Sequence, residues 1–260
     1  MKEAKLKLLN DLYERISAFP ELIRLAEKIV QNEFNLSNNY ENPLNWADRK
    51  IEDVIDEIRD NMVHLVIGEV MKGYNVSVDS SKIKELAKNN GFDAFAIAKY
   101  LEKKYLSRAD EIAFQQILER AQKFLPTIYE GFENRMPDVE EIVKKNRLIL
   151  RHYGMDWGLD TGPYLYNFLS DAEALEKLIR VVLLKEEPSK AHSGHISSAY
   201  LNANGRDALE RKELYTVIKA IKIHKNHKVI IWLESEEDAR RVAEVLLGKK
   251  NPNWSGKEGG

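Results

Sequence analysis

The chain has 260 residues, of which 43% are hydrophobic and 32% are charged, and its formal net charge is −2. This composition is typical of a globular protein and excludes a disordered or collagen-like chain. The sequence contains no cysteine, which excludes disulfide bonds, thiolate zinc sites and cysteine nucleophiles.

Residues 1–145 are predicted to form a helical domain. Apolar residues recur at helical spacing in several segments, and loop-forming residues separate these segments. The longest predicted helix begins after Asn45 and runs to about Met71. Residues predicted to cap the next three helices at their N-termini are Asp79, Asp93 and Ser107.

Residues 146–250 are predicted to form a smaller α+β domain. The segment NRLILRHYG partly alternates between polar and apolar residues, and PYLYNFLS, residues 163–170, is predicted as a second strand. A helix capped by Ser170 should follow. The segments LYTVIKAIKIHKN and HKVIIWLES then predict a hairpin, and Ser235 should cap the last helix. Residues 251–260 are predicted to form a flexible tail.

Two segments of this region share one order of elements: strand, turn, strand, serine-capped helix and proline. They span about residues 146–188 and 214–252. The similarity reflects either a ββα-ββα duplication or chance, since strand–helix units are common. A duplication predicts a four-stranded antiparallel sheet with two helices on one face and the other face available to a partner. In either case, the predicted fold class is α+β, with an all-helical N-terminal region followed by a small antiparallel sheet and two helices.

A candidate catalytic pair lies in the longest predicted helix. Arg59, followed by polar residues, precedes His64 by five positions, and this resembles the signature of HEPN ribonucleases, which are helical bundles. The resemblance implies that Arg59 stabilises a phosphate and that His64 acts as acid or base toward a ribose hydroxyl. Arg147 and His152 repeat the spacing on a predicted strand, so it also arises by chance. The alternative is that Arg59 is solvated and His64 is half-buried.

A basic segment coincides with the predicted hairpin. From residue 211 to 228, six Lys and Arg residues are accompanied by one acid, Glu213, and by an aromatic residue. Such a hairpin can follow a phosphate backbone, although lysines on an edge strand also protect against aggregation. A tryptophan in the glycine-rich turn before residue 163 could stack on a base. The predicted nucleic-acid-binding residues are Arg211, Lys212, Tyr215, Lys219, Lys222, Lys225, Lys228 and Trp157.

No cofactor or metal is expected. The sequence lacks glycine-rich nucleotide-binding loops, the Gly-x-Ser-x-Gly elbow and the His-Glu-x-x-His motif. His192 and His195 form one closely spaced pair, and His224 and His227 form another. Nearby lysines would repel a metal cation at both pairs.

The C-terminal segment ELYTVIKAIKIHKNHKVIIWLESEEDARRVAEVL resembles a domain of unknown function found in phage, plasmid and other mobile-element genes. The shared features are a hairpin with a Lys-Asn turn and the helix that follows, although His227 stands where glycine is usual. The resemblance implies a mobile-element or defence setting. It implies no catalytic residue.

We expect a cytoplasmic protein, because the N-terminal residues do not resemble a signal peptide and no apolar stretch approaches 18 residues. Dense, balanced charge rich in Lys and Glu resembles the surfaces of thermophilic proteins. The sequence favours a non-catalytic binding module whose partner is nucleic acid or a nucleic-acid-processing protein. Two alternatives stay open: a metal-independent HEPN-type ribonuclease and a protein-interaction scaffold.

Overall fold

The computed structural model describes residues 2–18, 51–130, 133–152, 163–194, 196–198, 208–211, 217–224 and 228–254. Contacts between residues divide the chain into two compact units. Unit 1 comprises Met1–Gly73 and Val78–Ser107, and unit 2 comprises Tyr74–Ser77 and Arg108–Gly260. This division lies earlier in the chain than the predicted boundary at residue 145. The chain has the predicted α+β fold class.

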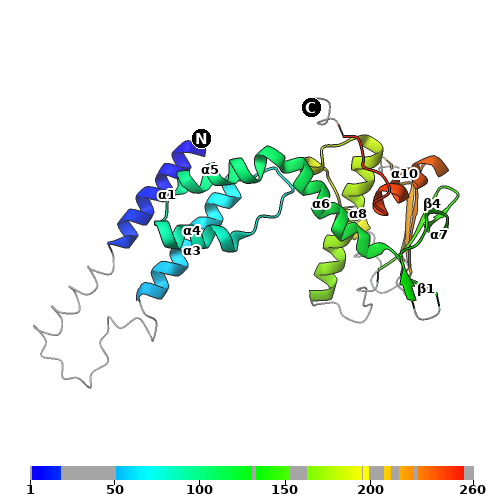
Figure 1. The fold of residues 1–260 in the computed structure, drawn as a ribbon, viewed down its shortest axis with the longest axis horizontal. Coiled ribbons are helices and arrows are strands. Elements are labelled where there is room, and N and C mark those ends of the chain that lie inside the picture. Colours follow the sequence, from blue (N-terminus) through cyan, green and yellow to red (C-terminus); the bar gives the residue numbers. More distant parts are fainter. Residues whose placement is uncertain are drawn as a thin grey trace, which may run out of the picture. The chain divides into compact units, whose positions relative to one another are not determined.

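Unit 1 is built from helices. Its described helices are α1 (Lys2–Ser17), α3 (Ile51–Val70), α4 (Ser80–Asn90) and α5 (Ala94–Lys104), shown in Figure 1. Val63 and Val66 of α3 and Leu101 of α5 are fully buried in its interior. The N-caps predicted for α4 and α5 are confirmed, because Asp79 and Asp93 accept hydrogen bonds from the first turns of their helices.

The cap predicted at Ser107 is wrong. Ser107 lies in a 3-10 turn, η1 (Leu106–Arg108), and its hydroxyl donates to the carbonyl of Lys103 at the end of α5. The hydroxyl therefore stabilises the end of one helix rather than the start of the next.

Unit 2 combines helices with two antiparallel sheets. Its described helices are α6 (Ala109–Ala121), α7 (Val139–Ile142), α8 (Pro163–Leu184) and α10 (Glu236–Leu246), with 3-10 turns η2 (Gln122–Phe124) and η3 (Pro188–Lys190). Strands β1 (Ile128–Glu130) and β2 (Glu133–Arg135) pair alone. The larger sheet has the order β3 (Val143–Lys144), β4 (Arg147–Arg151), β7 (Lys228–Trp232), β6 (Ala220–Ile223) and β5 (Ala208–Arg211).

The strand predicted at residues 163–170 is wrong, because these residues form the first turns of α8. The aromatic and apolar residues of PYLYNFLS fit a strand or a helix, and proline is well suited to the first turn of a helix. Phe168, Ala172 and Leu175 continue one apolar stripe at helical spacing, and all three are fully buried. Ser170 is consequently an interior residue of α8 and not its cap.

The predicted hairpin is confirmed, since β6 and β7 are adjacent and antiparallel. The sheet nevertheless has five strands where the duplication predicted four. Strands β3 and β5 form its two edges, and the strand expected between residues 163 and 170 is helical.

One face of the five-stranded sheet packs into the core of unit 2. Side chains on a strand alternate between the two faces. The inward residues of the central strands are 1% exposed or less and share a core with α8 and α10, which lie beside the sheet in Figure 1. These inward residues are Leu148, Leu150, Ile221, Ile223, Val229 and Ile231.

The start of the predicted C-terminal tail is packed. Trp254 is 6% exposed, and its ring lies 5.3 Å from the ring of Phe114 on α6. Pro252 is also buried. Residues 255–260 lie outside the described residues. Two residues of the predicted flexible tail, Pro252 and Trp254, are therefore packed against the rest of unit 2.

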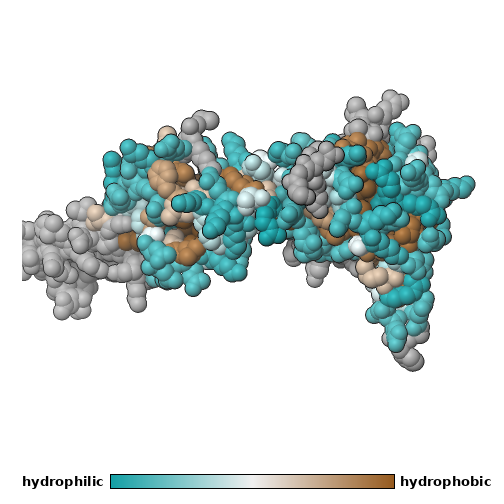
Figure 2. Space-filling model, turned by 45° about the horizontal axis from the view of Figure 1, so that its top comes forward, coloured by the Kyte–Doolittle hydropathy of each residue, from teal (hydrophilic) through white to brown (hydrophobic). Residues whose placement is uncertain are grey.

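Hydrophilic residues cover most of the surface visible in Figure 2, and hydrophobic residues form smaller patches on it. Across the described part of the chain, no helix is long and apolar enough to cross a membrane.

Candidate nucleic-acid interface

The second face of the five-stranded sheet is strongly basic. Strand alternation and register assign to this face the residues that point away from α8 and α10. Five of them are basic, and none of the described strand residues on this face is acidic. We call these five residues the cationic face: Lys144, Arg147, Arg151, Lys222 and Lys228.

The register brings these basic residues close to one another across four strands. Lys144 pairs with Arg147, and Arg151 pairs with Lys228. Directly opposed side chains have Cβ atoms about 4.5–5.5 Å apart, and like charges in this position destabilise a sheet. Arg151 and Lys228 also interact with other groups of the chain. Like charges therefore lie side by side on this face of the sheet.

The centre of the same face is apolar. Ile149 on β4 pairs with Ile230 on β7, which pairs in turn with Lys222 on β6. Trp232 lies between Arg147 and Ala220 in the next row, and its side chain is partly exposed. Ile230 and Ala220 are buried, so Trp232 and the surrounding cations are among the groups open to a ligand. A partly exposed indole can stack on a base while nearby cations contact phosphates.

The structure places two predicted binding residues, Lys222 and Lys228, on the cationic face. Lys219 lies just before β6 and pairs with Glu234, so its charge is locally neutralised. Arg211 ends β5 opposite Ala220, and its side chain is not described. Four predicted residues lie outside the described part of the chain: Trp157, Lys212, Tyr215 and Lys225.

Four further members of this surface were not predicted from the sequence: Lys144, Arg147, Arg151 and Trp232. Arg147, Ile149 and Arg151 occupy alternate positions of the segment RLILR, which is the signal for a strand with one basic face. The signal does not reveal that this strand pairs with β7, about eighty residues later in the chain.

The predicted catalytic pair, Arg59 and His64, lies on helix α3 of unit 1. Arg59 is 8% exposed, and its guanidinium lies 2.8 Å from a carboxylate oxygen of Asp56 and 3.9 Å from one of Asp60. His64 is exposed on the same helix, α3. Positions five apart on an α-helix are separated by about 140° around its axis. Arg59 and His64 therefore point in different directions, and carboxylates already oppose the charge of Arg59.

Unit 2 also contains a buried polar cluster that was not predicted from the sequence. Asp171 of α8 is 1% exposed, and its two carboxylate oxygens lie 3.0 Å from His152 Nε2 and 3.1 Å from Lys123 Nζ. The rings of Phe124 and Phe168 pack against the imidazole at 4.7 Å and 5.2 Å. This packing indicates a structural role, because it ties the end of β4 to α8 and covers the imidazole.

Among the residues that the structure describes, no group of three His, Asp or Glu side chains is placed to hold a metal ion. The resemblances to HEPN ribonucleases and to the mobile-element domain rest on short motifs and stay predictions. No protein-family model, curated protein or solved structure matches the chain.

Proposed function

We propose that the protein binds single-stranded nucleic acid through the cationic face of its five-stranded sheet. The observation that carries this proposal is the concentration of five basic residues, without an acid, on the described strand positions that point away from the helices. Basic side chains that neutralise phosphates supply most of the affinity in binding that is independent of base sequence.

The residue types on this sheet face favour a single strand over a duplex. Bases of a single strand are free to stack on aromatic side chains, and Trp232 lies among the cations. The grooves of a duplex are usually entered by a protruding helix or ribbon, whereas the cationic face belongs to a sheet. We therefore expect weak dependence on base sequence and preference for single strands.

Fluorescence anisotropy with short single-stranded and duplex probes of DNA and RNA tests this proposal. The wild-type chain should bind single strands more tightly than duplexes of the same length. Replacing Arg147, Arg151, Lys222 and Lys228 with Gln should weaken binding at least about tenfold, because several charge-assisted phosphate contacts are lost. Equal affinity of this variant and the wild type would refute the proposal.

Each probe should afterwards be run on a denaturing gel. Intact probes are expected for a binding module. Shortened RNA that disappears on His64→Ala would instead support the ribonuclease hypothesis. If neither binding nor cleavage is observed, a protein partner becomes the better explanation for the cationic face.

A further inference from the structure

A pocket within unit 2 brings two cations together on the side of α8 that faces α6. Its walls are α6, α8 and the segment Tyr74–Ser77, which belongs to the same unit. It encloses about 290 Å³, near the lower end of the range for small-molecule sites. Ile117 and Ala174, both buried, form apolar parts of its wall. None of its lining residues belongs to the sheet.

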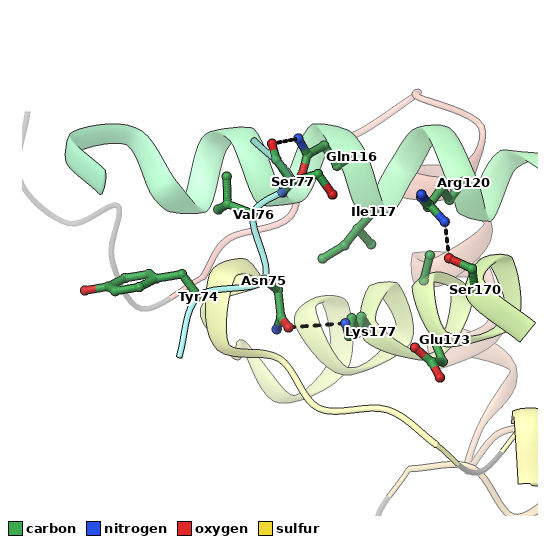
Figure 3. A pocket seen from close by; sticks show the side chains of 11 residues that line it. Tyr74, Asn75, Val76, Ser77, Gln116, Ile117, Arg120, Ser170, Glu173 and Lys177 are labelled. Atoms are coloured by element: carbon green, nitrogen blue, oxygen red, sulfur yellow. Dashed lines mark hydrogen bonds between the residues drawn. The ribbon is translucent and has the colours of Figure 1, made fainter. Parts of the chain in front are cut away.

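The two cations are Arg120 of α6 and Lys177 of α8. Figure 3 shows Arg120 directed toward Ser170 and Lys177 directed toward Asn75. The guanidinium of Arg120 donates to the Ser170 hydroxyl, and Lys177 Nζ lies 3.3 Å from Asn75 Oδ1. Both of these partners are neutral. Within the described part of the chain, no carboxylate lies within 4 Å of either cation.

The environment of Lys177 is unfavourable for an isolated charge. Burial lowers the pKa of Lys177, and the nearby positive charge of Arg120 lowers it further. The carboxylates of Glu173, one helical turn earlier on α8 and more exposed, and of the buried Glu176 raise the pKa and so oppose these effects. An anion between the two cations would favour the charged form of Lys177, which offsets its desolvation, and would reduce the repulsion between Lys177 and Arg120.

The neutral walls of the pocket are held in place by reciprocal hydrogen bonds. Gln116 donates to the carbonyl of Ser77 and accepts from its backbone N–H, both at 2.9 Å. Asn75 donates its side-chain amide to the carbonyl of Ala191 at 2.8 Å, which directs its Oδ1 toward Lys177. The segment that closes the pocket is thus fixed before any ligand binds, which reduces the cost of binding.

We infer that this pocket binds the phosphate group of a small phosphorylated molecule, held between Arg120 and Lys177 with the Ser170 hydroxyl as a further donor. A planar guanidinium, an ammonium and a hydroxyl together supply donors to a tetrahedral oxyanion. The charged residues that line the pocket are Arg120, Lys177 and Glu173, so the net charge of the lining is positive. The inference is independent of nucleic-acid binding, because the pocket and the cationic face share no residue.

Isothermal titration calorimetry of the full chain with inorganic phosphate tests this inference. Arg120→Gln and Lys177→Gln should each weaken phosphate binding about tenfold, the loss expected for one charge-assisted contact. Glu173→Gln should strengthen binding, because it removes the only acid of the pocket lining. The matched control is Arg108→Gln, which removes an exposed arginine near the start of α6 outside the pocket and should leave binding unchanged.

Thermal unfolding without phosphate separates loss of binding from loss of fold. Lys177→Gln removes a partly buried charge and should not lower the melting temperature. Two results would overturn the inference: no binding of millimolar phosphate by the wild type, or equal binding by the wild type and both the Arg120→Gln and Lys177→Gln variants. Equal weakening by Arg108→Gln would also overturn it, because binding would then follow total charge and not the pocket.

Discussion

The carboxylate of Glu141, the third residue of α7, accepts hydrogen bonds from two parts of unit 2. The guanidinium of Arg135 on β2 donates to both of its oxygens at 2.8 Å, and the backbone N–H of Asp138 donates at 2.7 Å. These bonds lower the pKa of Glu141 from its usual 4.5 to about 2, and the bonds from Arg135 have the largest effect. A single residue thus links the β1–β2 hairpin to the first turn of α7.

This shift predicts a specific dependence of stability on pH. The unfolded chain takes up the proton near pH 4.5, whereas folded Glu141 takes it up only near pH 2. Its contribution to the free energy of unfolding is therefore complete above about pH 4.5 and is lost between pH 4.5 and 2. In urea unfolding at a series of pH values, Glu141→Gln should show a smaller decline over this window than the wild type. The control Glu133→Gln, an exposed glutamate on β2, should keep the wild-type decline; the same decline in both variants would contradict the prediction.

At the scale of elements, the capping signal at Ser235 predicts the start of the last helix, α10, correctly. Ser235 Oγ accepts a hydrogen bond from the backbone N–H of Asp238 at 3.1 Å, and Ser235 has the extended backbone of an N-cap. Three acids in the first turn add a favourable interaction with the helix dipole. The buried face of α10, including Val242 and Leu246, then packs into the core of unit 2.

The cap can be tested separately from this packing. Ser235→Ala should lower the free energy of unfolding by about 1 kcal/mol, because the N–H of Asp238 loses its partner. Ser235→Thr keeps a hydroxyl at the same position and should retain most of the stability. Chemical denaturation followed by circular dichroism measures both effects. A Thr variant as unstable as the Ala variant would indicate that packing, and not capping, is responsible.

The same elements show where sequence reasoning succeeds and where it fails. The β6–β7 hairpin and the caps at Asp79, Asp93 and Ser235 depend on neighbours in the chain, so local patterns reveal them. The start of α8 was missed because PYLYNFLS satisfies both periodicities, and only burial against the core selects the helix.

The cationic face was predicted only in part for a related reason. Lys222 and Lys228 belong to one hairpin, and their proximity follows from its turn. Arg147 and Arg151 join them through the pairing of β4 with β7, a contact between distant parts of the chain. Long-range strand pairing depends on the whole fold and cannot be derived from one segment.

At the scale of the whole molecule, the two units should unfold as separate cooperative blocks. Each has its own buried apolar residues: Ile83 of α4 is 1% exposed in unit 1, and Ile179 of α8 is fully buried in unit 2. Replacing either isoleucine with Ala should lower the free energy of unfolding of its unit by about 2–5 kcal/mol, because apolar burial is lost and a cavity forms.

Scanning calorimetry of the two isoleucine variants measures this independence. Ile83→Ala should lower the temperature of one transition, and Ile179→Ala should lower the other. These matched substitutions remove the same atoms, so each serves as the control for the other. Equal displacement of the whole unfolding profile by both variants would show that the units unfold as one block.

The measurement that tests nucleic-acid binding most directly is the salt dependence of affinity for a single-stranded probe. The variant that replaces Arg147, Arg151, Lys222 and Lys228 with Gln should have a slope of log affinity against log salt that is shallower by about 3, since each phosphate contact to a single strand contributes about 0.7. The control replaces four exposed lysines of unit 1 with Gln and changes the net charge equally: Lys7, Lys72, Lys99 and Lys103. A control that keeps the wild-type slope would support binding at the cationic face, whereas an equal loss of slope in both variants would contradict it.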